Sequence, residues 1–152
     1  MHLVKGIKQI GYVVDDLDSV KQLYEREWGQ LEWVHYEYSK EDFEDHPRYT
    51  HGKLIPVAAK IAKTTVGNVE LEFIKPMCND SIYSEFLSKY GPGFHHLQLD
   101  VDNFEDSLSY FKSQGYEVIQ DGVSKRGVRI TYFDTYNAYG FYIEIAVYDY
   151  LK

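Results

Sequence analysis

The sequence predicts an α+β fold in which two βαβββ modules form a shared, curved mixed sheet with the helices outside it. Two observations predict this fold. Strand-like apolar stretches alternate with amphipathic helical patterns, and the second half of the chain repeats the order of the first. The segments "QIGYVVDDLDSVKQLYEREWG" and "HLQLDVDNFEDSLSYFKSQG" match when Gln9 is laid over His96. Paired modules of this kind share a concave face, where we expect the functional site.

The first module is expected within residues 1–78. Residues 7–14 are rich in β-forming residues and predict a buried strand. A helix should follow from Leu17 to Trp28, with Asp16 as its N-cap and Gly29 at its end. Further strands are expected at 31–38, 54–65 and 68–76. The polar segment 39–52 contains Pro47 and Gly52 and predicts a long loop.

The second module is expected within residues 79–152, where a linking helix at 81–91 precedes the repeat. A strand then begins at His96, and a helix with Phe104, Leu108 and Phe111 on its inner face leads to Gly115. Strands at 115–120, 127–135 and 140–148 complete the module. The two modules together should form one functional domain.

Charge and composition exclude several classes of function. The net charge of −8, without a basic run, argues against nucleic acid or an anionic membrane surface as a partner. A single cysteine, Cys78, excludes an internal disulfide, and no apolar run is long enough for a signal peptide or a membrane span. We therefore expect a cytoplasmic protein. The 15 tyrosines could wall a pocket or simply reflect a strand-rich fold, and the pocket candidates are Tyr12, Tyr36, Tyr38, Tyr132 and Tyr142.

Two adjacent histidines, His95 and His96, lie at the start of a predicted strand. Because side chains alternate across a strand, we expect only one of them to face the shared cavity. His96 is the counterpart of Gln9 in the repeat. A lone strand histidine is more often a hydrogen-bonded core residue than a ligand, so this alternative stays open.

Acidic residues stand among apolar neighbours in the last strand of each module. These are Glu70 and Glu72 in "VELEFI" and Glu144 in "FYIEIAV". A carboxylate in such a strand is costly to bury unless it is paired or binds a metal, although a solvated face would also explain it. With Gln9 and His96 they give four candidate donors whose oxygen and imidazole groups suit divalent Zn, Ni, Co or Mn.

The segments "QIGYVVDDLD", "VELEFIKP", "GPGFHHLQLDVDNFEDSL" and "GFYIEIA" together resemble the vicinal oxygen chelate superfamily. This group contains glyoxalase I, methylmalonyl-CoA epimerase, extradiol dioxygenases and bleomycin- or fosfomycin-resistance proteins. The run 69–101 is most similar to methylmalonyl-CoA epimerases. The resemblance implies His96 and Glu144 as metal ligands, and a match on Pro76 implies Glu72 rather than Glu70.

Two positions depart from the epimerase pattern. Epimerases usually have histidine at the position of Gln9, so the set Gln9, Glu72, His96 and Glu144 resembles the ligand set of glyoxalase I and leaves no two-histidine iron site. Epimerases also have a carboxylate in the strand region of the first half that serves as a second base. Here residues 51–65, in that region, contain no Asp or Glu. Three lysines in this stretch could bind an anionic substrate, but solvent-exposed strand charges are the favoured interpretation: Lys53, Lys60 and Lys63. Three histidines in or near the loop are expected to be solvated rather than ligands: His35, His46 and His51.

The resemblance implies a divalent-metal-dependent isomerase, epimerase or carbon-sulfur lyase that stabilises an enediolate while a proton next to a carbonyl is removed. Glu144 would be ligand and base, and Glu72 ligand or partner acid. The expected substrate is a small 2-oxo, thioester or hemithioacetal compound, and we expect a homodimer. One alternative is a metal-free protein of the same fold that binds small molecules such as drugs. Another is a scaffold in which Gln9 marks lost activity.

Overall fold

The computed structural model describes residues 3–55 and 57–152 and contains helices and strands from both predicted modules. In chain order they are β1 (Val4–Val13), α1 (Leu17–Trp28), β2 (Val34–Tyr38), the 3-10 helix η1 (Lys40–Phe43), β3 (Tyr49–Thr50), β4 (Lys53–Leu54), β5 (Ala59–Val66), β6 (Val69–Pro76), α2 (Ile82–Tyr90), β7 (Gly93–Val101), α3 (Phe104–Ser113), β8 (Val118–Val123), β9 (Arg129–Phe133), α4 (Tyr136–Tyr139) and β10 (Tyr142–Val147).

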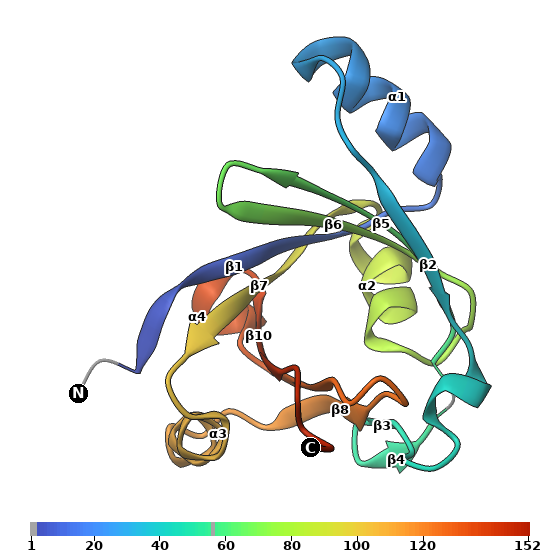
Figure 1. Ribbon diagram of the computed structural model, residues 1–152. Coiled ribbons are helices and arrows are strands. Elements are labelled where there is room, and N and C mark those ends of the chain that lie inside the picture. Colours follow the sequence, from blue (N-terminus) through green and yellow to red (C-terminus); the bar gives the residue numbers. More distant parts are fainter. Residues whose placement is uncertain (1–2, 56) are drawn as a thin grey trace.

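One mixed sheet contains all the strands, in the order β2-β5-β6-β1-β7-β10-β9-β8-β3-β4. The antiparallel pair β1 and β7 lies at its centre. On either side the same arrangement recurs, because β6 runs parallel to β1 and β10 runs parallel to β7. The predicted α+β fold with a repeated unit is therefore confirmed. Figure 1 shows the sheet curving around an interior that both halves face.

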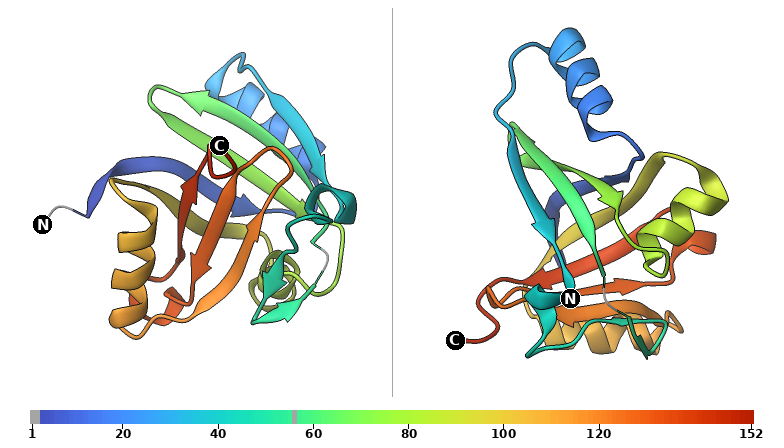
Figure 2. Two further views of the ribbon diagram at one scale, coloured as in Figure 1. Left: turned by 60° about the horizontal axis from the view of Figure 1, so that its bottom comes forward. Right: turned by 90° about the vertical axis from the view of Figure 1, so that its right-hand side faces the viewer.

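The helices lie outside this curved sheet, as the sequence predicts. Asp16 caps α1 by accepting a hydrogen bond from the Ser19 amide, and Gly29 ends the helix at a φ of 90°. Figure 2 shows α1 and α3 on the outer side of opposite halves of the sheet. Phe104 and Phe111 of α3 are buried against β9 and β10. No helix in the described part of the chain has the length and apolar character needed to cross a membrane.

The segment predicted as a loop, residues 39–52, is more ordered than its polar composition suggests. It forms η1 and β3, and β3 pairs with β8 at the far edge of the second half of the sheet. The strand predicted at 54–65 is also corrected: β5 begins at Ala59, residues 53–54 form β4, and Pro56 lies outside the described residues. The first half of the chain is thus connected to the second at the centre and at one edge. The division at residues 78 and 79 falls between β6 and α2 and stays a prediction.

Candidate active site

The four predicted donors lie together at the centre of the sheet. Gln9, Glu72, His96 and Glu144 come from the adjacent strands β1, β6, β7 and β10, and each is at most 6% exposed. His96 Nε2 is 3.1 Å from Gln9 Oε1, 3.0 Å from Glu144 Oε2 and 3.5 Å from Glu72 Oε1. Repeat symmetry brings these residues together, because β1 and β7 start the two modules while β6 and β10 end them.

Gly11 on β1 makes room for the imidazole of His96. In the register of the sheet Gly11 lies between Glu72 on β6 and His96 on β7. A Cβ atom at position 11 would stand only 1.9 Å from His96 Cε1. The absence of a side chain at this position therefore allows the imidazole to lie over β1. This role of Gly11 was not predicted, although the residue stands two positions after Gln9 and so shares its face of β1.

The prediction that His95 and His96 point to opposite sides of the sheet is wrong. β7 has a register shift here, since Gly11 pairs with His96 but Tyr12 pairs with Phe94, so His95 is an extra residue on β7. Both histidines are fully buried, and their Nδ1 atoms are 2.9 Å apart and share a hydrogen bond. The bulge breaks the alternation on which the prediction depended. The hydrogen bond from His95 therefore helps to fix the orientation of the His96 ring.

Glu70 and Glu72 occupy different positions relative to His96. Glu72 faces His96, whereas Glu70 accepts a hydrogen bond of 2.7 Å from Gln9 Nε2. The expectation that Lys63 is a solvated strand cation is wrong, because its side chain is only 19% exposed and lies 3.1 Å from Glu70 and 3.4 Å from Glu72. Glu70 and Lys63 therefore form an outer layer around the inner donors.

Ion pairing shifts the pKa values at the centre of the site. Burial opposes the charge on Glu72, but Lys63 and then His96 outweigh burial and lower the Glu72 pKa to about 2. Burial likewise opposes the charge on His96, but Glu144 and Glu72 raise the His96 pKa to about 9. For His95, burial and the neighbouring charge of His96 lower the pKa well below its usual range. An imidazolium at His96 beside a neutral His95 and an ionised Glu72 is the state these shifts favour.

The two oxygens of Glu144 have different partners. Gln98 donates a 3.1 Å hydrogen bond to Glu144 Oε1, and the Tyr148 hydroxyl donates to Gln98 Oε1 at 2.9 Å. Glu144 Oε2 is buried and has no hydrogen-bond partner among the residues described, apart from its ion pair with His96. Gln98 and Tyr148 were missed in the sequence, although Gln98 follows His96 by two residues and so shares its face of β7.

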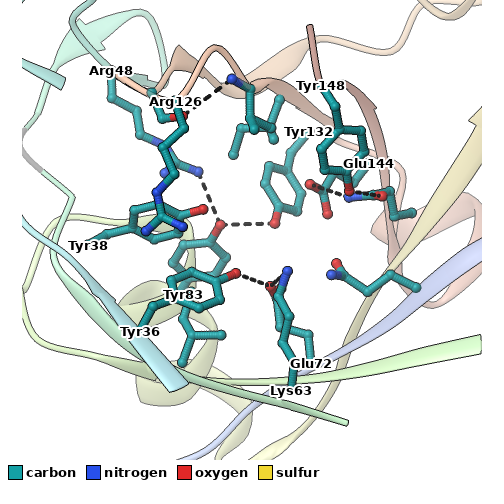
Figure 3. Close-up of a pocket in the computed structure, with 16 residues that line it drawn as sticks. Tyr36, Tyr38, Arg48, Lys63, Glu72, Tyr83, Arg126, Tyr132, Glu144 and Tyr148 are labelled. Carbon is teal, nitrogen blue, oxygen red and sulfur yellow. Dashed lines mark hydrogen bonds and ion pairs between the residues drawn. The ribbon is translucent and has the colours of Figure 1, made fainter. Parts of the chain in front are cut away.

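Gln9, Glu72 and Glu144 line a cavity of about 240 Å³ between the two halves of the sheet, and His96 lies behind them. Its wall includes Tyr36, Tyr38, Tyr83, Tyr132 and Tyr148 (Figure 3). Tyr12 and Tyr142, which were also expected there, instead pack against Phe73 and against His95. The cavity is aromatic on its sides and ionic at its base.

Five of the residues expected to be solvated do not line the cavity: His35, His46, His51, Lys53 and Lys60. His35 lies on β2 rather than in a loop, and His51 pairs with Glu85 at 2.8 Å. Lys60 is 47% exposed and pairs with Glu37.

The donor set suits a divalent cation in its chemistry. Ligands about 2.1 Å from an ion and at right angles to each other are about 3 Å apart, which is close to the separations around His96 Nε2. Among the described residues, however, no group of three or more His, Cys, Asp or Glu side chains could hold a metal ion as it stands. The inner donors are ion-paired with each other instead. A cation could bind between Glu72, Glu144 and His96 if it displaced the proton that His96 holds there.

Comparisons with known proteins agree with this fold. The family model for the Glyoxalase/Bleomycin resistance protein/Dioxygenase superfamily matches residues 8–132. The structure is similar to methylmalonyl-CoA epimerase from Mycobacterium tuberculosis, with 22% identity over 95% of this chain and 88% of that chain and a TM-score of 0.66.

It is also similar to a variant of the Streptomyces coelicolor methylmalonyl-CoA epimerase in complex with 2-nitronate-propionyl-CoA. That match has 22% identity over 94% of this chain and 96% of that chain, with a TM-score of 0.67. A methylmalonyl-CoA epimerase in complex with methylmalonyl-CoA and NH4+ matches with 23% identity, 95% and 94% coverage and a TM-score of 0.67. The search of curated proteins finds no match.

Proposed function

The chain belongs to the Glyoxalase/Bleomycin resistance protein/Dioxygenase superfamily, and from that premise we propose that it is a metal-dependent enzyme that removes a proton next to a carbonyl group. The observation that supports this most directly is Glu144. Its carboxylate is 3% exposed and lines the cavity, and among the described residues its Oε2 is paired with His96 alone, at 3.0 Å. A buried carboxylate held in this way at the cavity wall is suited to accept a proton from a bound substrate.

The proposed metal ligands are Gln9, Glu72, His96 and Glu144. A divalent ion such as Zn, Ni, Co or Mn, when bound, supplies positive charge that stabilises an enediolate. Glu72 suits the role of a permanently ionised ligand better than that of partner acid, because its pKa is lowered to about 2 by Lys63 and His96 against the effect of burial. Outside the ligands, Glu70 holds the amide of Gln9 and His95 holds the imidazole of His96.

Glu144 then has the task of moving the proton. Gln98 fixes Glu144 Oε1, so Oε2 is the oxygen that takes the proton and returns it. Residues 51–65 contain no Asp or Glu that could serve as a second base. We therefore favour a reaction in which one base takes the proton from one position and delivers it to a neighbouring one, as in an isomerase or lyase acting on a 2-oxo, thioester or hemithioacetal substrate.

A test of this proposal is deuterium exchange from solvent into candidate substrates. Protein purified without a metal-affinity tag and supplied in turn with Zn, Ni, Co and Mn would be incubated in D2O. The substrates would be 2-oxobutyrate, methylmalonyl-CoA and the hemithioacetal of methylglyoxal with a thiol. We expect metal-dependent exchange that Glu144→Gln abolishes. Glu37→Gln changes a 68% exposed strand glutamate and should have no effect. Exchange that persists in Glu144→Gln would refute the assignment of the base.

The aromatic wall of the cavity favours a second candidate, a metal-free binding protein for small molecules. Tyr36, Tyr38 and Tyr132 could enclose an apolar ligand without any chemistry. Metal analysis separates the two candidates. Substoichiometric metal that added Zn, Ni, Co or Mn does not restore would contradict the enzyme and support the binding protein.

A further inference from the structure

The cavity contains a buried arginine that the proton-transfer chemistry does not use. Arg48 lies directly before β3 and is 2% exposed. Its side chain lines the cavity beside Arg126, on the opposite side from Glu72 and Glu144 (Figure 3). The sequence places Arg48 in a polar segment next to Pro47, and nothing in the pattern distinguishes it from a solvated loop cation.

Arg48 has no carboxylate partner among the described residues. Its one hydrogen bond runs from Nη2 to the Tyr83 hydroxyl at 3.3 Å, and its Nε is buried without a partner. The rings of Phe43 and Tyr38, at 4.9 and 5.8 Å, stabilise the guanidinium in part. A buried cation without an anion is costly, and the five N–H donors of a guanidinium exceed what these contacts satisfy. The missing partner is an anion.

The fold makes specific room for this arginine. A Cβ atom on Gly122 of β8 would stand 2.7 Å from Arg48 Cγ. Gly122 therefore allows the stem of Arg48 to cross β8 and enter the cavity between the halves of the sheet. Arg126, in the turn between β8 and β9, lies over the ring of Tyr36 at 5.4 Å and is exposed at the cavity mouth. One cation is thus fixed inside the cavity and a second stands at its entrance.

Two tyrosine hydroxyls connect Arg48 to the proposed catalytic groups. The Tyr83 hydroxyl accepts from Arg48 and donates to the Tyr132 hydroxyl at 2.9 Å. The ring of Tyr132 packs edge-on against His96, with centroids 5.1 Å apart. Arg48 and Glu144 line one cavity of about 240 Å³, which suits a small ligand that contacts both.

We propose that the substrate is a small carboxylic acid whose carboxylate binds Arg48 while its reacting carbon faces Glu144. This inference rests on the proposed function for the identity of the reacting end, whereas the anion site rests on Arg48 alone. A carboxylate matches the planar, forked donors of a guanidinium and supplies the acceptor that Nε lacks. Glu72 and Glu144 line the region opposite, so one negative charge suits the cavity better than two. The acid group belongs to the small reacting molecule and does not require a long carrier.

The test measures binding of matched acid and amide pairs by calorimetry. The probes are acetate, 2-oxobutyrate and benzoate, each against its neutral primary amide, with inorganic phosphate as a further anion. We expect at least one acid to bind at least ten-fold more tightly than its amide. Arg48→Met should remove this preference, and Arg48→Lys should restore it in part. Arg26→Met changes an exposed arginine of α1 and should leave it unchanged.

Thermal unfolding without ligand distinguishes a ligand-binding arginine from a structural one. If Arg48 is a cation that awaits a ligand, Arg48→Met without ligand should melt at the same temperature as the parent or above it, because an unpaired buried charge is lost. A large drop in melting temperature would indicate a structural arginine and contradict the proposal. No Arg48-dependent preference for any of the acids would also overturn it. Tighter Arg48-dependent binding of phosphate would overturn the assignment to a carboxylate.

The same measurements on Glu144→Gln separate this inference from the proposed function. Arg48-dependent acid binding without deuterium exchange in the parent protein would leave the anion site standing and refute the enzyme. Deuterium exchange that Glu144→Gln abolishes but Arg48→Met leaves unchanged would support the enzyme and refute the role of Arg48 in binding the substrate.

Discussion

Replacing Gly11 with alanine should displace His96 and disrupt the centre of the site. The new Cβ would stand 1.9 Å from His96 Cε1, and ordinary contact begins at about 3.4 Å, so the ring must move by about 3.4 − 1.9 = 1.5 Å. The distances of 3.1 and 3.0 Å from His96 Nε2 to Gln9 and Glu144 would then exceed hydrogen-bonding range. The φ angle of Gly11 is not positive, so the clash alone causes the damage.

The expected cost is several kcal/mol. Each hydrogen bond to a charged group contributes about 1.5–3 kcal/mol, and overpacking a core costs about 1–3 kcal/mol. Because these terms are not additive, we expect Gly11→Ala to lower the free energy of unfolding by about 3–5 kcal/mol. Against a typical total of about 5–15 kcal/mol, this is a large loss. Urea denaturation would measure it.

Gly6→Ala is the matched control for this experiment. Gly6 lies on the same strand, and a Cβ atom there would meet nothing within 4 Å. We expect its free energy of unfolding to stay within about 0.5 kcal/mol of the parent. Equal stability of the two variants, together with unchanged cation binding by Gly11→Ala, would show that the imidazole does not depend on the space over β1.

Three further predictions concern the groups around His96. In protein treated with a chelator, the His96 pKa of about 9 lies above the unfolded value of 6.5. The charge on His96 therefore stabilises the fold fully below pH 6.5, and this stabilisation is lost as pH rises through 9. In urea denaturation, the difference in the free energy of unfolding between the parent and His96→Gln should shrink over this range. A difference that does not change with pH would contradict this. His95→Phe should keep the fold but weaken Co binding about 10- to 100-fold, because the Nδ1 hydrogen bond to His96 is lost; unchanged affinity would leave His95 only a packing role. Lys63→Met should tighten Co binding several-fold, since Lys63 competes for Glu72, whereas Lys60→Met on the same strand should not; weaker binding would show that Lys63 helps the site.

The repeat made the fold and the four central donors predictable. Equivalent strand positions in two modules must meet when the modules pair, so Gln9 and His96 come together, and the last strand of each module adds Glu72 and Glu144. Only the resemblance favoured Glu72 over Glu70, and the roles of these residues as ligands or base remain proposals. The repeat and the strand order alone predict Gln9, His96, Glu144 and one of the pair Glu70 and Glu72.

What could not be predicted depends on irregularities and on distant contacts. Strand alternation assumes a regular ladder, and the extra residue in β7 at His95 violates that assumption. Arg48 belongs to a segment that pairs with a strand about 70 positions further along the chain, and local composition does not encode such a pairing. Lys63 is buried because it meets Glu70 and Glu72 across β5 and β6, whereas its own strand suggests an exposed cation.

The pairing of β3 with β8 has a consequence for how a ligand enters and leaves. Only two residue pairs, Tyr49 with Asp121 and Thr50 with Gln120, join these strands, whereas β1 pairs along most of its length with β7. Short pairings at a sheet edge open locally far more often than long central ones. Arg48 directly precedes β3 and so depends on the short pairing with β8, whereas the inner donors lie on the strands with longer pairings. We therefore expect the wall that carries Arg48 to open more readily than the strands that carry Glu72 and Glu144.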